Sequence, residues 1–448
     1  MIKRRHPRLP WAVIAGLVAG TIPGAALAQT IVKPEFMFIV DTSGSMGAAT
    51  GSANSCGYTD RRINAAACVV RNIADSIGDA VFGLETFSFN CNPGTTCHYT
   101  SGTNSSCGNC GATTVTVPGY PFPFAGCIDS AQVNVNIAES NSYELRTWGD
   151  GRWTSCNNPS GLTAPTLGGN ELSNAFNTAC GGLAVSNTPL AGSMHVAWRY
   201  LANQLGAARP SPYVNFNNTG RIDPYARCRP VNVILMSDGG ETCVAGSNPA
   251  ANNARNIGCL RVDLNGDGDT TDPGEFNRDL NGDGDCYDVV AGVSEQSSFR
   301  TRSYSMFFGA RPGAAGEANT ENIATGGGID LHPVSTTAGV RNLRGYYATN
   351  ESEVSQAIND IVADSQLVEL CNGIDDDCDG LIDEDFNLGA ACQITDRACV
   401  SRGTLECRPL VDATRAFCNA APITPAAENT AATCRDGVDN DCDGATDC

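Results

Sequence analysis

Oxygen-bearing side chains follow an apolar run near the beginning of the sequence, in the peptide FIVDTSGSMG at residues 38–47. Asp41, Ser43 and Ser45 occupy alternate positions directly after three apolar residues. Such a run predicts a buried strand that presents these side chains at its C-terminal end, where open α/β sheets place their sites. Carboxylate and hydroxyl oxygens are hard ligands, so they favour binding of a divalent cation such as Mg²⁺. The simpler alternative is an ordinary Asp/Ser/Gly turn after a strand.

Two later segments offer oxygen atoms of the same kind. Thr188 lies in NTPLAGSM and precedes Pro189 at the start of a predicted helix, whereas Asp238 follows an apolar strand in VNVILMSDGG. A Thr before a Pro is also typical of a helix N-cap. The two roles of Thr188 are compatible, because a capping side chain at a helix end that faces a site already points outward.

The elements that position these residues alternate between strands and helices. This alternation predicts an α/β fold with a doubly wound, mainly parallel sheet and helices on both faces. A Gly/Ser/Asn/Cys-rich stretch from about residue 91 to 170 interrupts the alternation and predicts a disulfide-rich insertion. Apolar runs predict strands at 35–41, 80–89, 231–240, 303–310 and 346–350, and helical periodicity predicts helices at 63–78, 188–205 and 352–367.

The segments DTSGSM, NTPLAGSM and MSDGGET together resemble the ligand loops of a von Willebrand factor type A domain, over residues 31–368. The resemblance implies a Rossmann-like domain with a metal-ion-dependent adhesion site. It also implies a partner that supplies a carboxylate to the bound metal. The sequence departs from the family just before the Thr, where Ser186 and Asn187 replace a nearby Gly. The implied ligands of Mg²⁺ or Mn²⁺ are Asp41, Ser43, Ser45, Thr188 and Asp238.

Two near-copies of one Asp-rich segment, DLNGDGDTTD and DLNGDGDCYD, lie in an insertion at about residues 260–290. Alternating Asp and Asn with Gly at the sixth position resemble the calcium loops of EF-hands and dockerins. Both copies lack the bidentate Glu of the twelfth position, where Gly274 and Val290 stand. Asp272 and Asp288 recur instead at the tenth position of each copy, so we expect an oxygen-rich Ca²⁺ site without full EF-hand geometry. A solvated acidic linker is the alternative. The other implied Ca²⁺ ligands are Asp263, Asn265, Asp267, Asp269, Asp279, Asn281, Asp283 and Asp285.

The C-terminal region, residues 369–448, contains a second repeat, CNGIDDDCDGLIDE and CRDGVDNDCDGATD. This repeat resembles the MopE-type metal-binding motif of bacterial surface proteins. The family name is associated with copper, but the region has no His or Met, and oxidised cysteines would leave only hard oxygen ligands, which favours Ca²⁺. An acidic disordered tail is the alternative. The candidate ligands are Asp375, Asp377, Asp379, Asp383, Asp439, Asp441, Asp443 and Asp447.

Residues 1–28 predict a secretory signal peptide with four cationic residues, an apolar stretch and a cleavage site near Ala28. The apolar stretch is too short for a membrane span, so we expect a secreted or cell-surface protein of the bacterial envelope, not an integral membrane protein after processing. The even number of cysteines, 22, predicts disulfides in an oxidising compartment. The net charge is −20, and removal of the four cationic residues leaves −24, which excludes nucleic acid and anionic lipid as partners.

Catalytic motifs are absent from the sequence, which has no Gly-x-Ser-x-Gly, no His-Glu-x-x-His and no phosphate-binding Gly loop ending in Lys-Ser/Thr. His98 lies near Cys107 and Cys110, which could hold zinc, but an oxidising compartment favours disulfides. We therefore expect an exported binding protein, not an enzyme, that recognises a ligand through its metal site. Two alternatives stay open: a calcium-stapled structural component of the envelope or matrix, and an enzyme with its chemistry in residues 91–170.

Overall fold

The computed structural model describes most of the chain from residue 32 onward. The predicted signal peptide and much of the stretch at residues 91–170 lie outside the described residues. The described residues are 32–58, 60–78, 80–87, 114–125, 131–149, 188–241, 248–309, 311–313, 316–336, 338–373, 375–378, 381–396, 398–427, 429–430 and 432–446.

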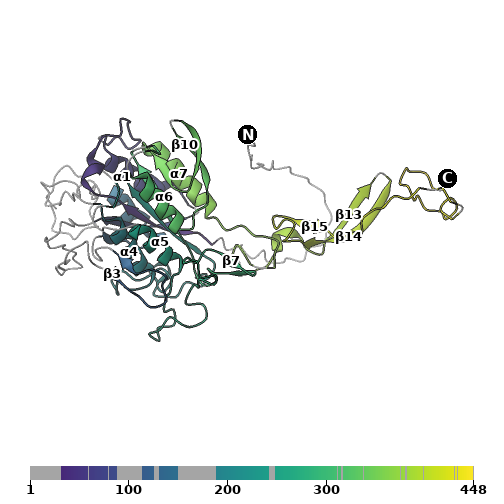
Figure 1. The fold of residues 1–448 in the computed structure, drawn as a ribbon, viewed down its shortest axis with the longest axis horizontal. Coiled ribbons are helices and arrows are strands. Elements are labelled where there is room, and N and C mark those ends of the chain that lie inside the picture. The colour runs from purple at the N-terminus through teal and green to yellow at the C-terminus, as the bar shows by residue number, and fades with distance from the viewer. Residues whose placement is uncertain are drawn as a thin grey trace, which may run out of the picture.

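A six-stranded sheet forms the centre of the α/β domain (Figure 1). The strand order is β12-β9-β6-β1-β2-β5, so that strands are added outward on both sides of β1. Among these six strands, β5 runs antiparallel to β2 and the other neighbours are parallel. The predicted α/β fold class with a mainly parallel sheet is thereby confirmed. The strands are β1 (Glu35–Val40), β2 (Val81–Phe87), β5 (Ala131–Val135), β6 (Pro230–Ser237), β9 (Arg300–Phe308) and β12 (Tyr346–Ala348).

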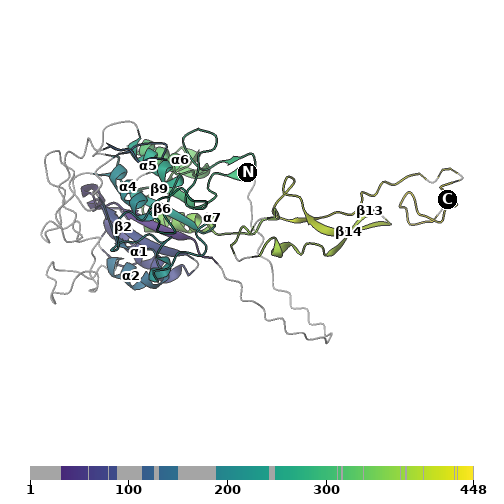
Figure 2. The same ribbon diagram turned by 90° about the horizontal axis from the view of Figure 1, so that it is seen from below.

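Helices cover both faces of this sheet (Figure 2). Alternate residues of β1 show how the sequence produces two cores, because successive side chains of a strand point to opposite faces. Phe36 and Phe38 join the core on one face, and Met37 and Ile39 join the core on the other. The first face carries α1 (Arg62–Ser76), α2 (Ser142–Gly149) and α7 (Glu351–Asp364), and the second carries α4 (Leu190–Leu201), α5 (Pro249–Gly258) and α6 (Glu317–Gly326).

The α/β domain extends into the stretch that the composition indicates as an insertion. Residues 131–149 form the edge strand β5 and the helix α2. Ala131, Val133 and Val135 of β5 are buried, so this strand contributes to the core despite its length of five residues. Its short run, flanked by Gly, Ser and Cys, is too weak a pattern to be recognised. The periodicity also does not predict α5 and α6, whose sequences PAANNARNIG and EANTENIATG contain few large apolar residues.

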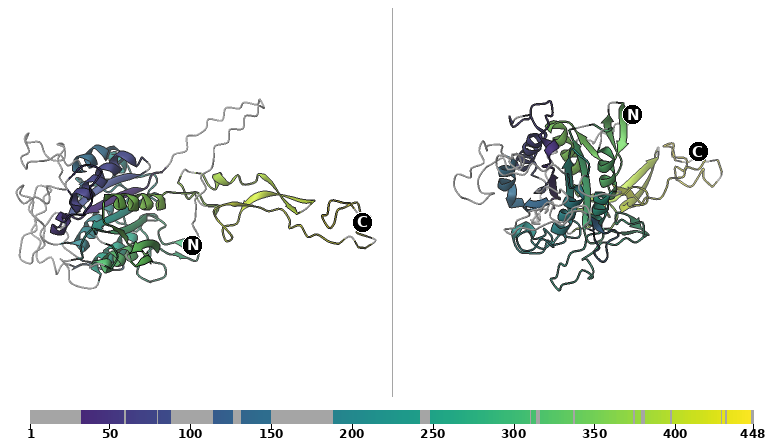
Figure 3. Two further views of the ribbon diagram at one scale, coloured as in Figure 1. Left: turned by 90° about the horizontal axis from the view of Figure 1, so that it is seen from above. Right: turned by 60° about the vertical axis from the view of Figure 1, so that its left-hand side comes forward.

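Short hairpins surround the domain, and a small three-stranded sheet forms the tail, which extends away from the domain (Figure 3). The hairpins pair β3 (Thr114–Val115) with β4 (Phe124–Ala125), β7 (Val289–Val290) with β8 (Val293–Ser294), and β10 (His332–Thr336) with β11 (Gly339–Leu343). The tail sheet contains β13 (Ala391–Asp396), β14 (Cys399–Cys407) and β15 (Ala416–Cys418). Short 3-10 helices span Gly44–Gly47, Glu139–Asn141, Phe216–Asn218 and Glu384–Phe386.

Disulfides connect both parts of the molecule, as the cysteine count predicts. The Cys228–Cys378 bond ties the tail to the segment that enters β6. Of the helices that the structure describes, none has the length and apolarity needed to cross a membrane. The bonds within the described residues are Cys56–Cys68, Cys228–Cys378, Cys259–Cys286, Cys371–Cys407, Cys392–Cys418 and Cys399–Cys442.

Candidate metal centre

Two of the predicted ligand loops lie at the topological switch point of the sheet. Strand β1 has β2 on one side and β6 on the other, so the chain leaves β1 on one side and returns on the opposite side. In open α/β sheets the crevice at the carboxyl ends of such strands binds ligands. Asp41 follows β1 and Asp238 follows β6. The N–H of Asp41 donates to the Met236 carbonyl at 2.9 Å, which holds the two strand ends together.

Hydrogen bonds join the Asp and Ser side chains of these two loops. Ser45 Oγ donates to Asp238 Oδ1 at 2.6 Å, across 193 residues of sequence. Ser43 Oγ lies 3.1 Å from Ser45 Oγ, and the Ser43 N–H donates to Asp41 Oδ1 at 2.6 Å. Ser237 Oγ donates to the other oxygen of Asp41, also at 2.6 Å. Carboxylate and hydroxyl oxygens from both loops are therefore gathered at one edge of the sheet.

Thr188 reaches the same edge from the segment before α4. Its side chain is buried, and its Oγ1 lies so close to Gly239 that a Cβ atom on that glycine would be 3.3 Å away. Glu241 links the segment after β6 to the start of α4, because its carboxylate oxygen Oε2 accepts the N–H of Ala191 at 2.6 Å. Pro189 occupies the N-cap position of α4, so the helix starts later than predicted and Thr188 stands one residue before the N-cap. The structure thus brings all five predicted residues to this edge.

The charge distribution of this edge fits a divalent cation. Burial raises the pKa of Asp41 to about 6, and the neighbouring Asp238 carboxylate contributes to the rise. Hydrogen bonds from Ser237 and Ser43 act in the opposite direction. A cation would remove the repulsion between the two carboxylates, and carboxylates with hydroxyls form the hard oxygen set that Mg²⁺ prefers.

Two residues at this edge are missed by the sequence motifs. Ser237 directly precedes Asp238, so a closer inspection of the strand end MSDGG would have found it. Arg62 begins α1 and forms an ion pair with Asp238, with 2.5 Å between Nη1 and Oδ2. No local signal marks Arg62, because its partner lies 176 residues away in the sequence.

The Asp-rich insertion forms two loops with the same internal hydrogen bonds. In each loop the first Asp accepts N–H groups from two Gly residues, and the Asn side chain donates to two other Asp carboxylates. In the first loop, oxygen atoms of Asp267, Asp269 and Asp272 lie within 4.8 Å of one another. Asp263 and Asn265 therefore shape the first loop, as Asp279 and Asn281 shape the second. The remaining predicted ligands of the second loop are Asp283, Asp285 and Asp288, of which Asp285 accepts the Tyr287 N–H.

The tail contains two further acidic groups, each with carboxylate oxygens within 4.8 Å of one another. One group adds Glu369, which the sequence motif misses because this residue precedes it, to two predicted Asp residues. The backbone N–H groups of Asp376 and Asp377 donate to Glu369 Oε2 at 2.9 and 3.1 Å. Predicted ligands Asp379 and Asp447 lie outside the described residues. The groups are Glu369, Asp375 and Asp377, and Asp439, Asp441 and Asp443.

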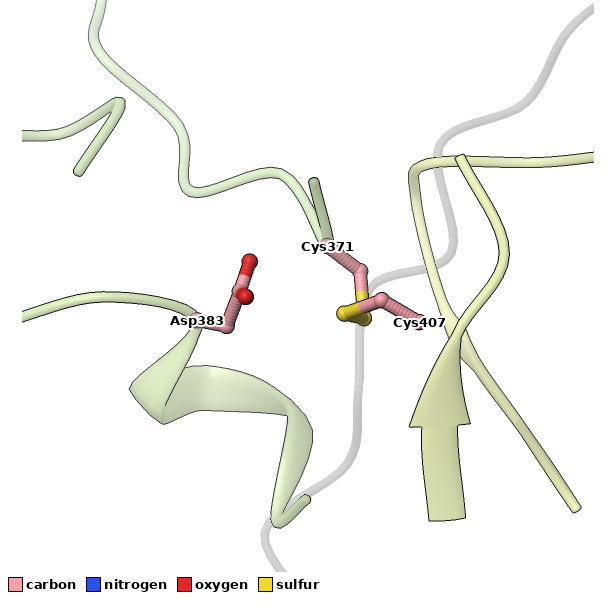
Figure 4. Close-up of side chains that lie close together, drawn as sticks. All are labelled: Cys371, Asp383 and Cys407. Carbon is pink, nitrogen blue, oxygen red and sulfur yellow. A yellow bond between two sulfur atoms is a disulfide. The ribbon is translucent and has the colours of Figure 1, made fainter. Parts of the chain in front are cut away.

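Asp383 lies beside the Cys371–Cys407 disulfide and is not in the Glu369 group (Figure 4). Its Oδ1 accepts the N–H groups of Asn372 and Gly373 at 2.8 and 3.1 Å. The carboxylate of Asp383 therefore holds the turn that begins the first tail repeat. Because the two sulfur atoms are bonded to each other, this site offers no thiolate to a metal ion.

Comparison with known families identifies one motif in the chain. The family model Cu-binding_MopE, described as "Putative metal-binding motif", matches residues 364–384 and 422–447. These ranges contain both predicted tail repeats, so the predicted MopE-type motif is confirmed. No curated protein matches the sequence.

Several solved structures are similar to the chain at low identity. Proximal thread matrix protein 1 from the mussel byssus is 11% identical with a TM-score of 0.32, and the match covers 74% of this chain and 48% of that one. An aerotolerance-related membrane protein from Bacteroides fragilis is 13% identical with a TM-score of 0.31, and the match covers 74% and 99%. The pilus adhesin SpaC from Lactobacillus rhamnosus GG is 13% identical with a TM-score of 0.28, and the match covers 75% and 31%. The match thus spans about half of the mussel protein, and because the scores are low we base no conclusion on these similarities.

The family match and the acidic groups both indicate metal binding by the tail. A metal-binding motif covers the tail repeats, where two groups of carboxylates converge. Disulfides hold both the tail and the α/β domain, as is typical of proteins in oxidising compartments. The chain therefore has the features of an extracellular metal-binding protein, with a MopE-type motif at its C-terminal end.

Proposed function

We propose that this chain is an exported, metal-dependent binding protein with an adhesion site of the von Willebrand factor type A kind. The single observation that carries the proposal is the 2.6 Å hydrogen bond from Ser45 Oγ to Asp238 Oδ1, which unites two loops 193 residues apart. In this proposal Asp41, Ser43 and Ser45 hold Mg²⁺ or Mn²⁺. Thr188 and Asp238 complete the ligand set, directly or through water.

The residues at this edge of the sheet have different roles in the proposed binding of a cation and a partner. The bound cation would supply positive charge and an open coordination position to a carboxylate of the partner. Asp41 is held in place by the Ser237 hydroxyl and the Ser43 N–H, so its oxygen atoms are preorganised. Ser45 is exposed at the rim, whereas Asp41 and Ser43 are buried, so the site is open on the side of Ser45. We infer that partner recognition involves no catalysis by the chain.

The proposal assigns Ca²⁺ to the Asp-rich loops and to the tail groups. The groups that converge there contain carboxylate oxygens, which Ca²⁺ prefers, and no imidazole or thioether that would favour copper. The small tail has few large apolar residues, so disulfides and bound cations would provide much of its stability. Export through the predicted signal peptide would bring the chain to the cell surface or the medium.

An alternative function is a structural component of the envelope or matrix that binds Ca²⁺ but no regulated ligand. The number of acidic loops and disulfides in the tail favours this alternative. Its cations would stiffen the molecule, and the edge at Asp41 would have no partner.

Calorimetric titration of the oxidised, chelator-treated chain with Mg²⁺ and Ca²⁺ tests the proposal. We expect Asp41→Ala to remove one Mg²⁺ site, and Asp267→Ala to remove one Ca²⁺ site without changing Mg²⁺ binding. Asp60→Ala is the matched control, because this exposed carboxylate binds Thr50 and lies outside the proposed site. An unchanged Mg²⁺ isotherm for Asp41→Ala would overturn the adhesion site.

Attachment of cells that export each variant separates the two functions. Loss of attachment with Asp41→Ala supports the adhesion protein. Attachment that survives Asp41→Ala but is lost with Asp267→Ala supports the structural component.

A further inference from the structure

The two Asp-rich loops are closed by glutamates that lie outside the repeated motif. Glu275 Oε1 accepts the N–H groups of Leu264 and Asn265 at 2.8 and 3.1 Å. In the second loop, Glu295 Oε1 accepts the N–H group of Leu280 at 2.6 Å and that of the following Asn at 3.4 Å. The two glutamates therefore make equivalent contacts, because each accepts the N–H groups of the second and third residues of its loop.

The equivalence of the two glutamates is not visible in the sequence, because they lie at different distances from their loops. Glu275 lies 11 residues after Leu264, whereas Glu295 lies 15 residues after Leu280. The hairpin of β7 and β8 occupies the additional length before Glu295. Both side chains are almost fully buried, with exposed fractions of 3% and 1%. The structure thus places a buried carboxylate against each loop, although the twelfth position of the motif itself is Gly274 or Val290.

The two carboxylates differ in their second oxygen. Glu295 Oε2 accepts the N–H of Asp288 at 3.1 Å, so both of its oxygens are bonded. Glu275 Oε2 is buried and has no hydrogen-bond partner in the part of the chain that the structure describes. Oε1 of the same carboxylate is bonded to the start of the loop, so Oε2 is anchored beside it, outside the group in which oxygen atoms of Asp267, Asp269 and Asp272 lie within 4.8 Å of one another. A buried carboxylate oxygen without a partner is costly, and a bound cation is one way to satisfy it.

We propose that the loop of residues 263–275 binds Ca²⁺ and that Glu275 Oε2 supplies the ligand missing from its twelfth position. Asp267, Asp269 and Asp272 already bring carboxylate oxygens within 4.8 Å of one another. The loop itself contains no Lys or Arg, and the nearby Arg227 donates to the Pro273 carbonyl at 3.3 Å. Several carboxylate oxygens in an irregular arrangement suit Ca²⁺ better than Mg²⁺, which requires near-octahedral geometry. The second loop has no free Glu oxygen, so the near-identical repeats form two unequal sites, the first of higher affinity. This inference rests on the metal-binding function proposed above.

Substitution of Glu by Gln tests the role of the free oxygen. In Glu275→Gln the amide oxygen still accepts the N–H groups of Leu264 and Asn265, but the second oxygen becomes an NH₂ group that cannot bind a cation. Glu295→Gln is the matched control, because it makes the same chemical change in the equivalent closing residue. Calorimetric titration with CaCl₂ is performed on the full oxidised chain, with Asp267→Ala and Asp283→Ala to assign each site to its loop.

We expect Glu275→Gln to weaken Ca²⁺ binding about tenfold or more at the site that Asp267→Ala removes, and Glu295→Gln to leave that site unchanged. The rise in melting temperature caused by Ca²⁺ shrinks accordingly, whereas the melting temperature in excess chelator does not fall. Unchanged affinity in Glu275→Gln, with loss of the site in Asp267→Ala, overturns the proposed ligand and leaves Glu275 a structural residue. An unaltered chain without any Ca²⁺ site overturns the proposed metal-binding function of this loop instead.

A second variant covers the case in which Glu275→Gln does not fold in chelator. Glu275→Asp keeps the charge on a shorter side chain, which cannot reach both the backbone N–H groups and the cation. Weaker Ca²⁺ binding at the Asp267 site supports the proposal, and affinity equal to that of the unaltered chain contradicts it.

Discussion

Arg62 and Asp238 form an ion pair at the edge of the sheet, with 2.5 Å between Nη1 and Oδ2. The Asp238 side chain is fully buried, and its other oxygen accepts the Ser45 hydroxyl. Asp238 is therefore shared between a cationic side chain and the oxygen atoms of the proposed metal site. The guanidinium neutralises part of the negative charge that would otherwise attract a divalent cation.

Replacing Arg62 with Gln should strengthen Mg²⁺ binding at this edge. Removal of one nearby positive charge favours the cation by about 1–2 kcal/mol, which corresponds to roughly a 5- to 30-fold higher affinity. Arg61→Gln is the matched control, because Arg61 is the adjacent residue and is exposed. Calorimetric titration with MgCl₂ measures both variants. Weaker binding in Arg62→Gln would show instead that the ion pair positions Asp238 for the metal.

Replacing Asp41 with Asn should stabilise the chain when metal is absent. The folded-state pKa of Asp41 is about 6, above its ordinary value of 3.8, so the folded state binds the proton more tightly than the unfolded state between these values. Stability is therefore lost as pH rises from about 4 to 6, by an amount of about 3 kcal/mol at neutral pH. Asn avoids this loss. Denaturant unfolding in chelator at pH 7 measures the gain, which saturating Mg²⁺ should reverse in favour of the unaltered chain.

Binding of Mg²⁺ should weaken in acid. Since the proton and the cation compete for Asp41, the apparent affinity is constant above pH 7 and falls about tenfold per unit below a pH of about 6. Titrations with MgCl₂ at pH 5, 6, 7 and 8 measure this dependence. A flat profile would show that Asp41 is not a ligand.

Replacing Glu85 with Met should stabilise the α/β domain. Glu85 lies on β2 with both carboxylate oxygens buried, and within the described residues neither has a hydrogen-bond partner. Burial raises the pKa of Glu85 well above its ordinary value, so its contribution to stability falls as pH rises above about 4.5. We expect a gain of about 1–3 kcal/mol in the free energy of unfolding for Met. Glu144→Met, at an exposed position of α2, should change stability by less than about 0.5 kcal/mol.

Much of the proposed adhesion edge follows from local sequence. The apolar runs before Asp41 and Asp238 predict two buried parallel strands, and such strands end at the same edge of a sheet. The order of the strands then makes the two loops neighbours. Periodicity and strand-end chemistry are local properties, so they are readable without the structure.

The charged partners of these sites do not follow from local sequence. Arg62 meets Asp238 through the packing of α1 beside the sheet, and the two closing glutamates stand at different distances from their loops. A motif of fixed length cannot include a glutamate whose sequence distance from its loop differs between the two copies, as it does here because the β7–β8 hairpin precedes Glu295. The edge strand β5 escapes prediction for another reason, since five residues give too short a pattern.

The Cys228–Cys378 bond determines how the molecule would carry a pulling force. The bond closes a covalent ring over a separation of 150 residues, a length that would extend to roughly 500 Å as a free chain. Tension applied to the tail passes from Cys378 directly to Cys228 and bypasses β6, β9, β12 and α7, which lie within the ring. Asp238 therefore lies inside the ring and does not carry the tension, whereas Asp41 directly follows β1, which lies outside the ring. A strong pull would separate Asp41 from Asp238 by moving β1 past β6, not by unfolding β6, which directly precedes Asp238.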